Sequence, residues 1–459
     1  MASRPKRSSL YALEPLIQKF PEVRSPKRHI PFKRKFMWSA FALVLYLIMA
    51  QIPLLGAGEA LNYFGQLQYV LASQAGTLMQ LGISPIVTSG IIMQLLVGAN
   101  LINLDLHNAR DKALFTGTQK ILALVVGAFQ ASAFVLSGAL GGDGGMTMLG
   151  LIIQLVIGVA AVLFLDEMVS KYGFGSGISL FIAGGVSMTV FWQAFNPLSE
   201  GGIYIGAIPR FIQALTSGAP GAVEDAFIAA GNSPDMVGVI ATIVVFMIVI
   251  YAVNMRVEIP LSYSQYGGMR GKYPIKFLYA SVIPVILSTV VFTNVSLLAR
   301  ATGWNFLGSF TDGNVTGGLY YYLTAPQGIG QVVSHPLRAL FYLGALIVFC
   351  MGFAWLWVQM TNMSASDVAD QIKRSGMSIP GFRRDTRIME NMLSRYITPV
   401  TLLGGAFVGL LAAGADFLGA LGSGTGILLA VSIVYRLYRE IAKEQLSEMF
   451  PAARRLLGD

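Results

Sequence analysis

The residues with the richest chemistry are few and widely spaced. The histidines His29, His107 and His335 lie in separate polar segments, so no two of them have the short spacing of a protein metal site. No G-x-x-x-x-G-K-[ST] sequence, the loop that binds nucleotide phosphates, is present. We therefore expect no metal, no cofactor and no nucleotide-driven step in this chain.

Two glycine-rich pieces superficially resemble phosphate loops. They are Gly173-Phe174-Gly175-Ser176-Gly177 and Gly422-Ser423-Gly424-Thr425-Gly426. Neither follows a predicted strand, and each opens a long apolar run. A tight turn or close helix packing is therefore the favoured interpretation of both.

Ionisable side chains are scarce within the apolar runs. Asp166 and Glu167 stand at the predicted inner end of one run, and Asp416 stands near the outer end of another. A secondary transporter would need a charged or ion-coordinating site near the middle of the membrane, and a membrane enzyme would need paired catalytic groups there. The sequence favours instead a passive hydrophobic constriction, which bars ions by excluding water. We expect no enzyme activity.

The composition requires a lipid environment for these runs. The chain has 459 residues, of which 54% are apolar and 12% charged, and its mean hydropathy is +0.64. A soluble protein typically has about 25% charged residues. Residues 1–36 are basic and polar and are followed by no small-residue cleavage site, so we expect no cleaved signal peptide. The single cysteine, Cys350, lies in an apolar run and allows no intrachain disulfide.

Apolar windows of about 20 residues predict an all-α membrane protein with about ten transmembrane helices. The predicted spans are 37–55, 77–98, 121–140, 147–166, 175–195, 237–255, 277–299, 337–360, 397–417 and 423–438.

The basic residues predict the orientation of these spans. With the N-terminus inside, only Arg210, Arg300 and Arg338 fall in outer segments, out of 32 lysines and arginines in the chain. Such a bias satisfies the positive-inside rule. The net charge of +9 is thus interpreted as a topology signal and not as a nucleic-acid surface. We predict a multi-pass protein of the cell membrane with both termini in the cytoplasm.

The spans divide into two halves of five, 37–195 and 237–438, around a Gly- and Pro-containing external hinge at 196–236. An odd number of spans in each half predicts an inverted repeat, although we detect no residue-level repeat between the halves. The segment 57–72 is too short and too polar to span, and we expect a re-entrant or capping segment. Residues 1–36 and 439–459 are predicted to be cytoplasmic, the former with a short surface helix around Leu10, Leu13, Ile17 and Phe20.

Four long stretches resemble the SecY family, the central channel subunits of the protein translocase, and most resemble its archaeal type. They are LGISPIVTSGIIMQLLVG (81–98), LDEMVSKYGFGSGISLFIAGGVS (165–187), MRVEIPLSYSQ with GKYPIKFLYASVIPVIL (255–287), and GTGILLAVSIVYRLYRE (424–440). The resemblance implies a pore-forming subunit that passes unfolded polypeptides across the membrane and releases apolar segments sideways into lipid. Segment 57–72 takes the place of the family's plug.

The resemblance also implies site residues. The pore ring maps to aliphatic positions, namely Ile83, Val87, Ile178, Ile182, Ile286 and Leu429. The residues alone show only that Ile83 and Val87, and likewise Ile178 and Ile182, share a helix face, which would equally suit lipid or a neighbouring helix. The lateral gate maps to Thr88, Gln130 and Asn294, although Thr88 could instead bond a carbonyl of its own helix.

Basic inner loops are the last implied site. By resemblance they dock on the ribosome, and the residues concerned are Arg270, Lys272, Arg383, Arg384 and Arg387. Pairing with RNA phosphate would suit Arg and Lys, whereas the simpler alternative is that these charges only set topology. The implied partners are small SecE-type and beta-type subunits, of which one clamps the two halves, the ribosome, signal sequences with nascent polypeptides, and membrane lipid.

Overall fold

The computed structural model describes most of the chain. The described residues are 10–11, 14–28, 30–57, 75–98, 101–102, 104, 108–136, 140, 145–200, 202–217, 221–228, 233–263, 270–311, 314–361, 363–374, 377–378 and 386–449.

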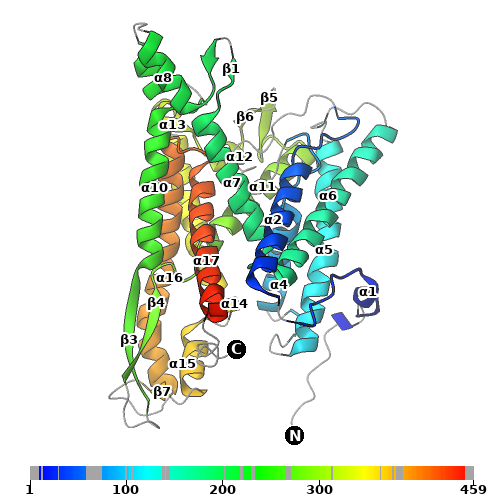
Figure 1. The fold of residues 1–459 in the computed structure, drawn as a ribbon, viewed down its shortest axis with the longest axis vertical. Coiled ribbons are helices and arrows are strands. Elements are labelled where there is room, and N and C mark those ends of the chain that lie inside the picture. Colours follow the sequence, from blue (N-terminus) through cyan, green and yellow to red (C-terminus); the bar gives the residue numbers. More distant parts are fainter. Residues whose placement is uncertain are drawn as a thin grey trace.

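Long helices dominate both halves. In the first half they are α2 (Phe32–Met49), α4 (Ser84–Gly98), α5 (Ala109–Leu136), α6 (Gly145–Tyr172) and α7 (Gly177–Phe195). In the second half they are α10 (Met236–Asn254), α11 (Ile283–Thr302), α14 (Pro336–Met360), α16 (Thr386–Phe417) and α17 (Gly424–Met449). Figure 1 shows α2, α4, α5 and α6 on one side of the molecule and α10, α14, α16 and α17 on the other.

These helices are consistent with the ten predicted spans. Among the described residues, seven helices are long and apolar enough to cross a membrane, and they are α5, α6, α7, α10, α11, α14 and α16. The helix α4 is apolar but shorter. The helix α2 begins with Lys33, Arg34 and Lys35, and α17 ends in a polar segment. Each of these two helices, α2 and α17, coincides with a predicted span but also includes charged residues at one of its ends.

Several helices extend beyond the predicted boundaries. α5 begins at Ala109, α16 begins at Thr386 and α17 ends at Met449, whereas the predictions were 121, 397 and 438. The added turns carry polar and basic side chains such as Lys112, Arg387 and Lys443. Hydropathy detects only the part of a helix that lies in lipid, so polar extensions past the membrane surface escape it.

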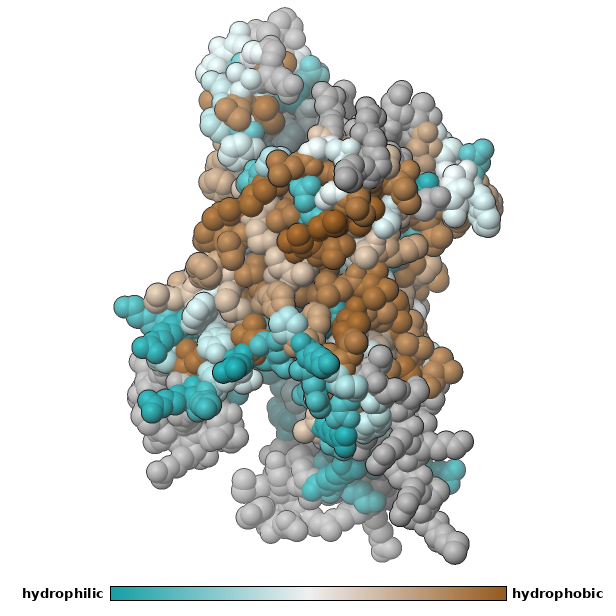
Figure 2. All heavy atoms as spheres, turned by 90° about the vertical axis from the view of Figure 1, so that its right-hand side faces the viewer, coloured by the Kyte–Doolittle hydropathy of each residue, from teal (hydrophilic) through white to brown (hydrophobic). Residues whose placement is uncertain are grey.

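The exterior matches a lipid-embedded protein. Large apolar side chains are exposed along the long helices, for example Phe129 at 64% and Tyr251 at 72% of full exposure. Figure 2 shows this apolar surface as a broad belt, with hydrophilic residues gathered at the lower end. A belt of this kind would be unstable in water and is expected where lipid covers the protein.

Short strands and helices lie at both ends of the long helices. The lower end in Figure 1, here called the basic end, carries α1 (Glu14–Lys19), α15 (Ala365–Arg374) and a sheet of order β4-β3-β7. Its strands are β3 (Arg256–Tyr263), β4 (Arg270–Lys276) and β7 (Met377–Ser378). The opposite end carries β1 (Ser199–Glu200), β2 (Ile203–Tyr204), α8 (Ala207–Ser217), α9 (Ala222–Phe227), β5 (Ser309–Thr311), β6 (Asn314–Gly317), α12 (Leu319–Leu323) and α13 (Gly328–Ser334).

The sequence prediction contained no strands. The β3–β4 hairpin forms because Val257, Ile259 and Leu261 alternate with polar residues or proline, a spacing of two that suits a strand. The helix α1 lies within the predicted N-terminal surface helix. Its Ile17 packs on α5, where a Cβ added to Gly117 would meet Ile17 Cγ2 at 2.2 Å.

The main hydrophobic core joins the two halves. It contains buried residues of α2, α6 and α7 together with residues of α10, α11, α14, α16 and α17. Tyr46 of α2 stacks on Phe181 of α7 with ring centroids 4.7 Å apart. At the basic end, Lys35 Nζ of α2 lies 2.6 Å from Glu444 Oε1 of α17. The halves therefore pack as one molecule around a shared apolar centre.

Candidate channel constriction and gate

The six predicted pore-ring residues, called the ring residues below, all belong to the main core cluster or pack against it. Ile83, Ile182 and Leu429 are buried, and Val87, Ile178 and Ile286 are partly buried and packed against the cluster. They come from α4 or the residue before it, and from α7, α11 and α17. The structure thus brings together side chains that are up to 346 positions apart (429 − 83).

Each ring residue lies close to the beginning of its helix. Ile83 directly precedes α4, Ile286 is the fourth residue of α11, and Ile182 and Leu429 are the sixth residues of α7 and α17. At about 1.5 Å of rise per residue, a ring residue is within roughly 8 Å of a helix start. The position of these helix starts therefore sets the geometry of the ring.

The three predicted gate residues form one hydrogen-bonded network between α4, α5 and α11. Gln130 Nε2 donates to Asn294 Oδ1 at 3.1 Å, and Asn294 Nδ2 donates to Thr88 Oγ1 at 3.4 Å. Gln130 Nε2 also lies 3.4 Å from Ser84 Oγ, a residue that the sequence analysis did not single out. Ser84 opens α4, so its hydroxyl joins the network from the helix that also bears Val87.

A cavity near the basic end of the molecule is lined by several cationic side chains. It has a volume of about 740 Å³, and its lining includes Ser432, three residues after Leu429, and Ser281, five residues before Ile286. Its charged lining residues are Lys276, Arg436, Arg439, Lys443 and Glu440. Burial lowers the pKa of Lys276, and the nearby charge of Arg439 lowers it further. The cavity therefore has a net positive charge, and its lining includes residues close in sequence to two ring residues.

The predicted docking residues are described only in part. Lys272 is exposed and donates to Glu258 Oε2 at 2.6 Å, and this hydrogen bond lowers the pKa of Glu258. Arg387 is exposed near the start of α16. The backbone of Arg270 pairs with that of Ser262, whereas Arg383 and Arg384 lie outside the described residues.

The two basic loops meet at one sheet. Strand β7, which follows α15, pairs antiparallel with β3 through Ser262 with Ser378 and Tyr263 with Met377. The loop between α10 and α11 and the loop between α14 and α16 therefore share a backbone ladder. Periodicity gave no sign of this pairing, because β7 is only two residues long.

The predicted plug segment 57–72 lies outside the described residues except for Ala57, but its base is well defined. Pro53 forms a β-bridge with Thr77, Leu54 N donates to Gly76 O at 3.0 Å, and Leu78 N donates to Ile52 O at 3.0 Å. These bonds hold residues 52–54 beside residues 76–78, just after the end of α2.

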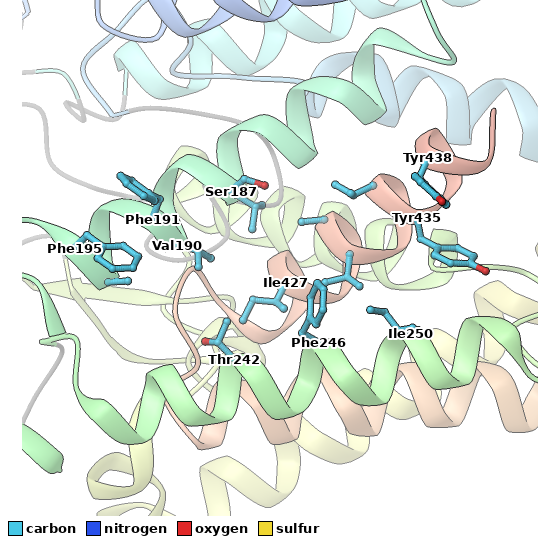
Figure 3. Close-up of a pocket in the computed structure, with 15 residues that line it drawn as sticks. Ser187, Val190, Phe191, Phe195, Thr242, Phe246, Ile250, Ile427, Tyr435 and Tyr438 are labelled. Atoms are coloured by element: carbon cyan, nitrogen blue, oxygen red, sulfur yellow. The ribbon is translucent and has the colours of Figure 1, made fainter. Parts of the chain in front are cut away.

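An apolar groove lies where the last helix of the first half meets two helices of the second half. It has a volume of about 570 Å³ and lies between α7, α10 and α17. Figure 3 shows Phe191 and Phe195 of α7 at one end of the groove, Phe246 of α10 near its middle, and Tyr435 and Tyr438 of α17 at the other end. The groove follows helices that lie in the apolar belt.

Metal-binding and thiol chemistry are not evident in the described part of the chain. It contains no group of three His, Cys, Asp or Glu residues that could hold a metal ion. Cys350 is buried in α14, with its Sγ 3.6 Å from Ser288 Oγ.

Comparisons with known proteins agree with this geometry. The SecY family model matches residues 77–438, and the model described as the plug domain of Sec61p matches residues 44–76. The chain is 46% identical to the protein translocase subunit SecY of Pyrococcus horikoshii, over 98% of this chain and 99% of that protein. It is 47% identical to that of Methanothermobacter thermautotrophicus, over 97% and 98%.

Solved structures give the same result. The fold matches a structure described as a protein conducting channel with a TM-score of 0.81 and 42% identity, over 96% of this chain and 99% of that one. It also matches Sec61 in the canine ribosome-channel complex from the endoplasmic reticulum, with a TM-score of 0.79 and 42% identity, over 96% and 99%.

Proposed function

Because the chain belongs to the SecY family, and is thus the channel subunit of a protein translocase, we propose that its six ring residues form the constriction through which polypeptides pass. The observation that supports this most directly is that all six side chains belong to, or pack against, the apolar core cluster that the two halves share. The protein is a multi-pass membrane protein, and we propose that its basic end faces the cytoplasm, as the positive-inside rule requires.

The chemistry of the ring suits this role. Aliphatic side chains offer no hydrogen-bond partner to a passing backbone, so a polypeptide is not retained at the constriction. When the ring is closed, its apolar walls exclude water and thereby ions. A translating ribosome or another external motor would supply the driving force.

The polar network is proposed as the lateral gate. It joins α4 and α5 of the first half to α11 of the second through Gln130, Asn294 and Thr88. Hydrogen bonds between membrane helices contribute about 0.6 kcal/mol each on average. An apolar signal sequence that packs between these helices would compete successfully with so few bonds, and the opened gate would release it into lipid.

The segment 57–72 is proposed as the plug. Support comes from the family match at residues 44–76 and from the closed loop base at Pro53 and Thr77. A loop held at its two ends can leave the channel axis without losing its attachment.

Ribosome docking is proposed for the two basic loops. Sec61 of the canine complex, a structural relative, is seen with the ribosome. Here the loops share the β4-β3-β7 sheet, so Arg270, Lys272, Arg383, Arg384 and Arg387 could contact RNA phosphate as one surface.

The apolar groove of Figure 3 is proposed to hold the single transmembrane helix of a SecE-type subunit. The groove is lined by α7, the last long helix of the first half, and by α10 and α17 of the second half. A helix bound in it would therefore contact both halves and clamp them together. A beta-type subunit is expected in addition, as in the family.

The test of this function is ion conductance in planar bilayers with the reconstituted complex. Ile83→Ser and Ile286→Ser should raise the conductance of the resting channel and let defective signal sequences be exported. Leu298→Ser is the matched control, because Leu298 is on the same helix as Ile286 but is 49% exposed. Unchanged conductance in both ring variants would contradict the assignment.

A further inference from the structure

Two helices that supply ring residues begin in the same way. α7 starts at Gly177 and α17 starts at Gly424, and each is preceded by a serine. The residue before that serine is a glycine in the left-handed region, Gly175 with φ 65° and Gly422 with φ 73°. The glycine-rich pieces that open these helices are therefore equivalent turns in the two halves.

The equivalence extends into the helices. Ile182 lies five residues after Gly177, and Leu429 lies five residues after Gly424. The residues on either side of Ile182 and Leu429 are buried to a similar degree. Phe181 is 0% exposed and its counterpart Leu428 is 1% exposed, whereas Ala183 is 4% exposed and its counterpart Ala430 is 7% exposed. Two ring residues thus occupy the same position of an internal repeat.

A carboxylate from the preceding helix bonds to each helix start. Asp166 Oδ1 of α6 accepts from Ile178 N at 2.9 Å and from Ser176 Oγ at 3.2 Å. In the other half, Asp416 Oδ1 of α16 accepts from Gly424 N at 2.6 Å. The second oxygen of Asp416 accepts from Tyr342 Oη at 3.0 Å.

The helix starts need these partners. The first backbone N–H groups of a helix have no acceptor within it, and each start contains a buried residue, Gly177 in one and Ser423, at 2% exposure, in the other. A carboxylate satisfies such donors with short, charge-assisted bonds and also favours the positive end of the helix dipole. Without it, buried N–H groups would lose their partners.

Each start also lies in close contact with the helix that supplies its carboxylate. A Cβ added to Gly177 would lie 2.5 Å from Asp166 Cα. A Cβ added to Gly424 would lie 2.2 Å from Ala412 O and 2.8 Å from Asp416 N. Glycine is therefore required at both positions, and the bonded geometry leaves little room for either helix to slide.

We propose that Asp166 and Asp416 are positioning residues of the constriction, which fix where α7 and α17 begin and thereby hold Ile182 and Leu429 at the ring. This inference rests on the ring role proposed above. A shift of one residue would move a ring side chain by about 1.5 Å and rotate it by roughly 100° around the helix. A displacement of that size would open the ring.

The experiment measures resting ion flux in proteoliposomes together with the melting temperature. Asp166→Ala and Asp416→Ala remove the acceptor, whereas Asp166→Asn and Asp416→Asn keep an Oδ1 acceptor. The alanine variants should raise the flux by roughly 5- to 30-fold, the factor expected for loss of a helix cap, and the asparagine variants should restore most of the closure.

Tyr342→Phe is the matched control. It removes a hydrogen bond from the same carboxylate but leaves the bond between Gly424 and Asp416 in place. It should lower the melting temperature without a leak. A leak that follows the melting temperature across all variants, Tyr342→Phe included, would overturn the positioning role, and so would tight closure in the alanine variants.

Two further substitutions keep the test decisive if the alanine variants fail to fold. Gly177→Ala and Gly424→Ala leave every polar group in place but push the helix start away from its neighbour, so they should leak, and their tight closure would count against the proposal. Ile182→Ser and Leu429→Ser test the ring itself. If they do not leak, the ring assignment fails; if they leak but the aspartate variants do not, only the positioning role fails.

Discussion

Gln130 of α5 and Asn294 of α11 are 164 positions apart in the chain, yet the Gln130 Nε2 group donates to Asn294 Oδ1 at 3.1 Å. The bond connects the first half of the molecule to the second, and Asn294 continues the connection to Thr88 of α4. A few weak polar bonds therefore hold a boundary that is otherwise apolar.

Replacing Asn294 with Leu should make this boundary easier to open. The variant loses the bonds to Gln130 and Thr88, together worth about 1 kcal/mol at the average for membrane helices. We expect signal sequences of lower hydrophobicity to be inserted, with a several-fold gain in efficiency for marginal signals. The measurement is insertion efficiency across signals of graded hydrophobicity.

Thr293→Val is the control for that series. Thr293 is the preceding residue of α11, and its Oγ1 donates to Thr289 O within the same helix, at 2.8 Å. It should leave the hydrophobicity threshold unchanged. Identical thresholds for Asn294→Leu and the wild type would show that the network does not gate the boundary.

The N-terminal segment should detach from the basic end at low pH. Lys171 Nζ donates to Glu22 Oε1 at 2.8 Å, and this bond lowers the pKa of Glu22 below its ordinary value of 4.5. The contact therefore stabilises the attached segment fully above about pH 5 and is lost as the pH falls through the lowered pKa. Limited proteolysis of residues 14–28 as a function of pH measures the release.

In the Glu22→Gln variant, residues 14–28 should be cleaved at neutral pH as readily as those of the wild type are at low pH. Glu14→Gln is a useful comparison, because Glu14 pairs with Arg110 at another point of the same segment, at 2.8 Å. If cleavage in the wild type is independent of pH between 7 and 3, Glu22 does not control the attachment.

Membrane spans were predictable because lipid imposes a simple rule on sequence. A run such as 237–255 must be apolar throughout, and α10 follows it to within one residue at each end. The contacts of Gln130 with Asn294 follow no such rule. Neither residue has a local pattern that points to the other, so the family resemblance supplied the prediction and the structure supplied the geometry.

The internal repeat escaped sequence analysis for a physical reason. Asp166 lies 11 residues before Gly177, but Asp416 lies only 8 residues before Gly424, so the two motifs do not align without a gap. What the two halves share is a spatial arrangement, in which a carboxylate of one helix accepts a hydrogen bond from the start of the next helix. The β3–β4 hairpin was missed differently, because its alternating residues fall in a loop with no apolar run.

Ribosome affinity should depend on the basic loops. Arg383→Glu with Arg384→Glu should weaken ribosome binding and reduce its salt dependence, because each lost phosphate contact lowers the slope by roughly 0.7 to 0.9. Cosedimentation at several salt concentrations measures both effects. Arg210→Glu with Arg338→Glu, at the predicted outer end, should change neither. If both pairs of substitutions leave binding unchanged, the loop arginines act only as topology charges.

Loosening the base of the plug segment should make the resting channel leak. Gln154 of α6 bonds both backbone groups of Leu55: its Oε1 accepts from Leu55 N at 2.9 Å, and its Nε2 donates to Leu55 O at 3.0 Å. Gln154→Leu removes both bonds, each worth about 1 kcal/mol, and should free the loop to leave the channel axis more often. We expect brief openings in planar bilayers at several times the wild-type frequency.

Gln213→Leu is a matched control for this effect. Gln213 makes the same pair of bonds to a loop backbone, accepting from Tyr204 N at 3.1 Å and donating to Gly202 O at 2.6 Å, but that loop is at the predicted external hinge. Its loss should lower stability by a similar amount without added openings. Equal opening frequencies in the two variants would mean that Gln154 only stabilises the fold, whereas openings confined to Gln154→Leu would identify its amide as the anchor of the plug.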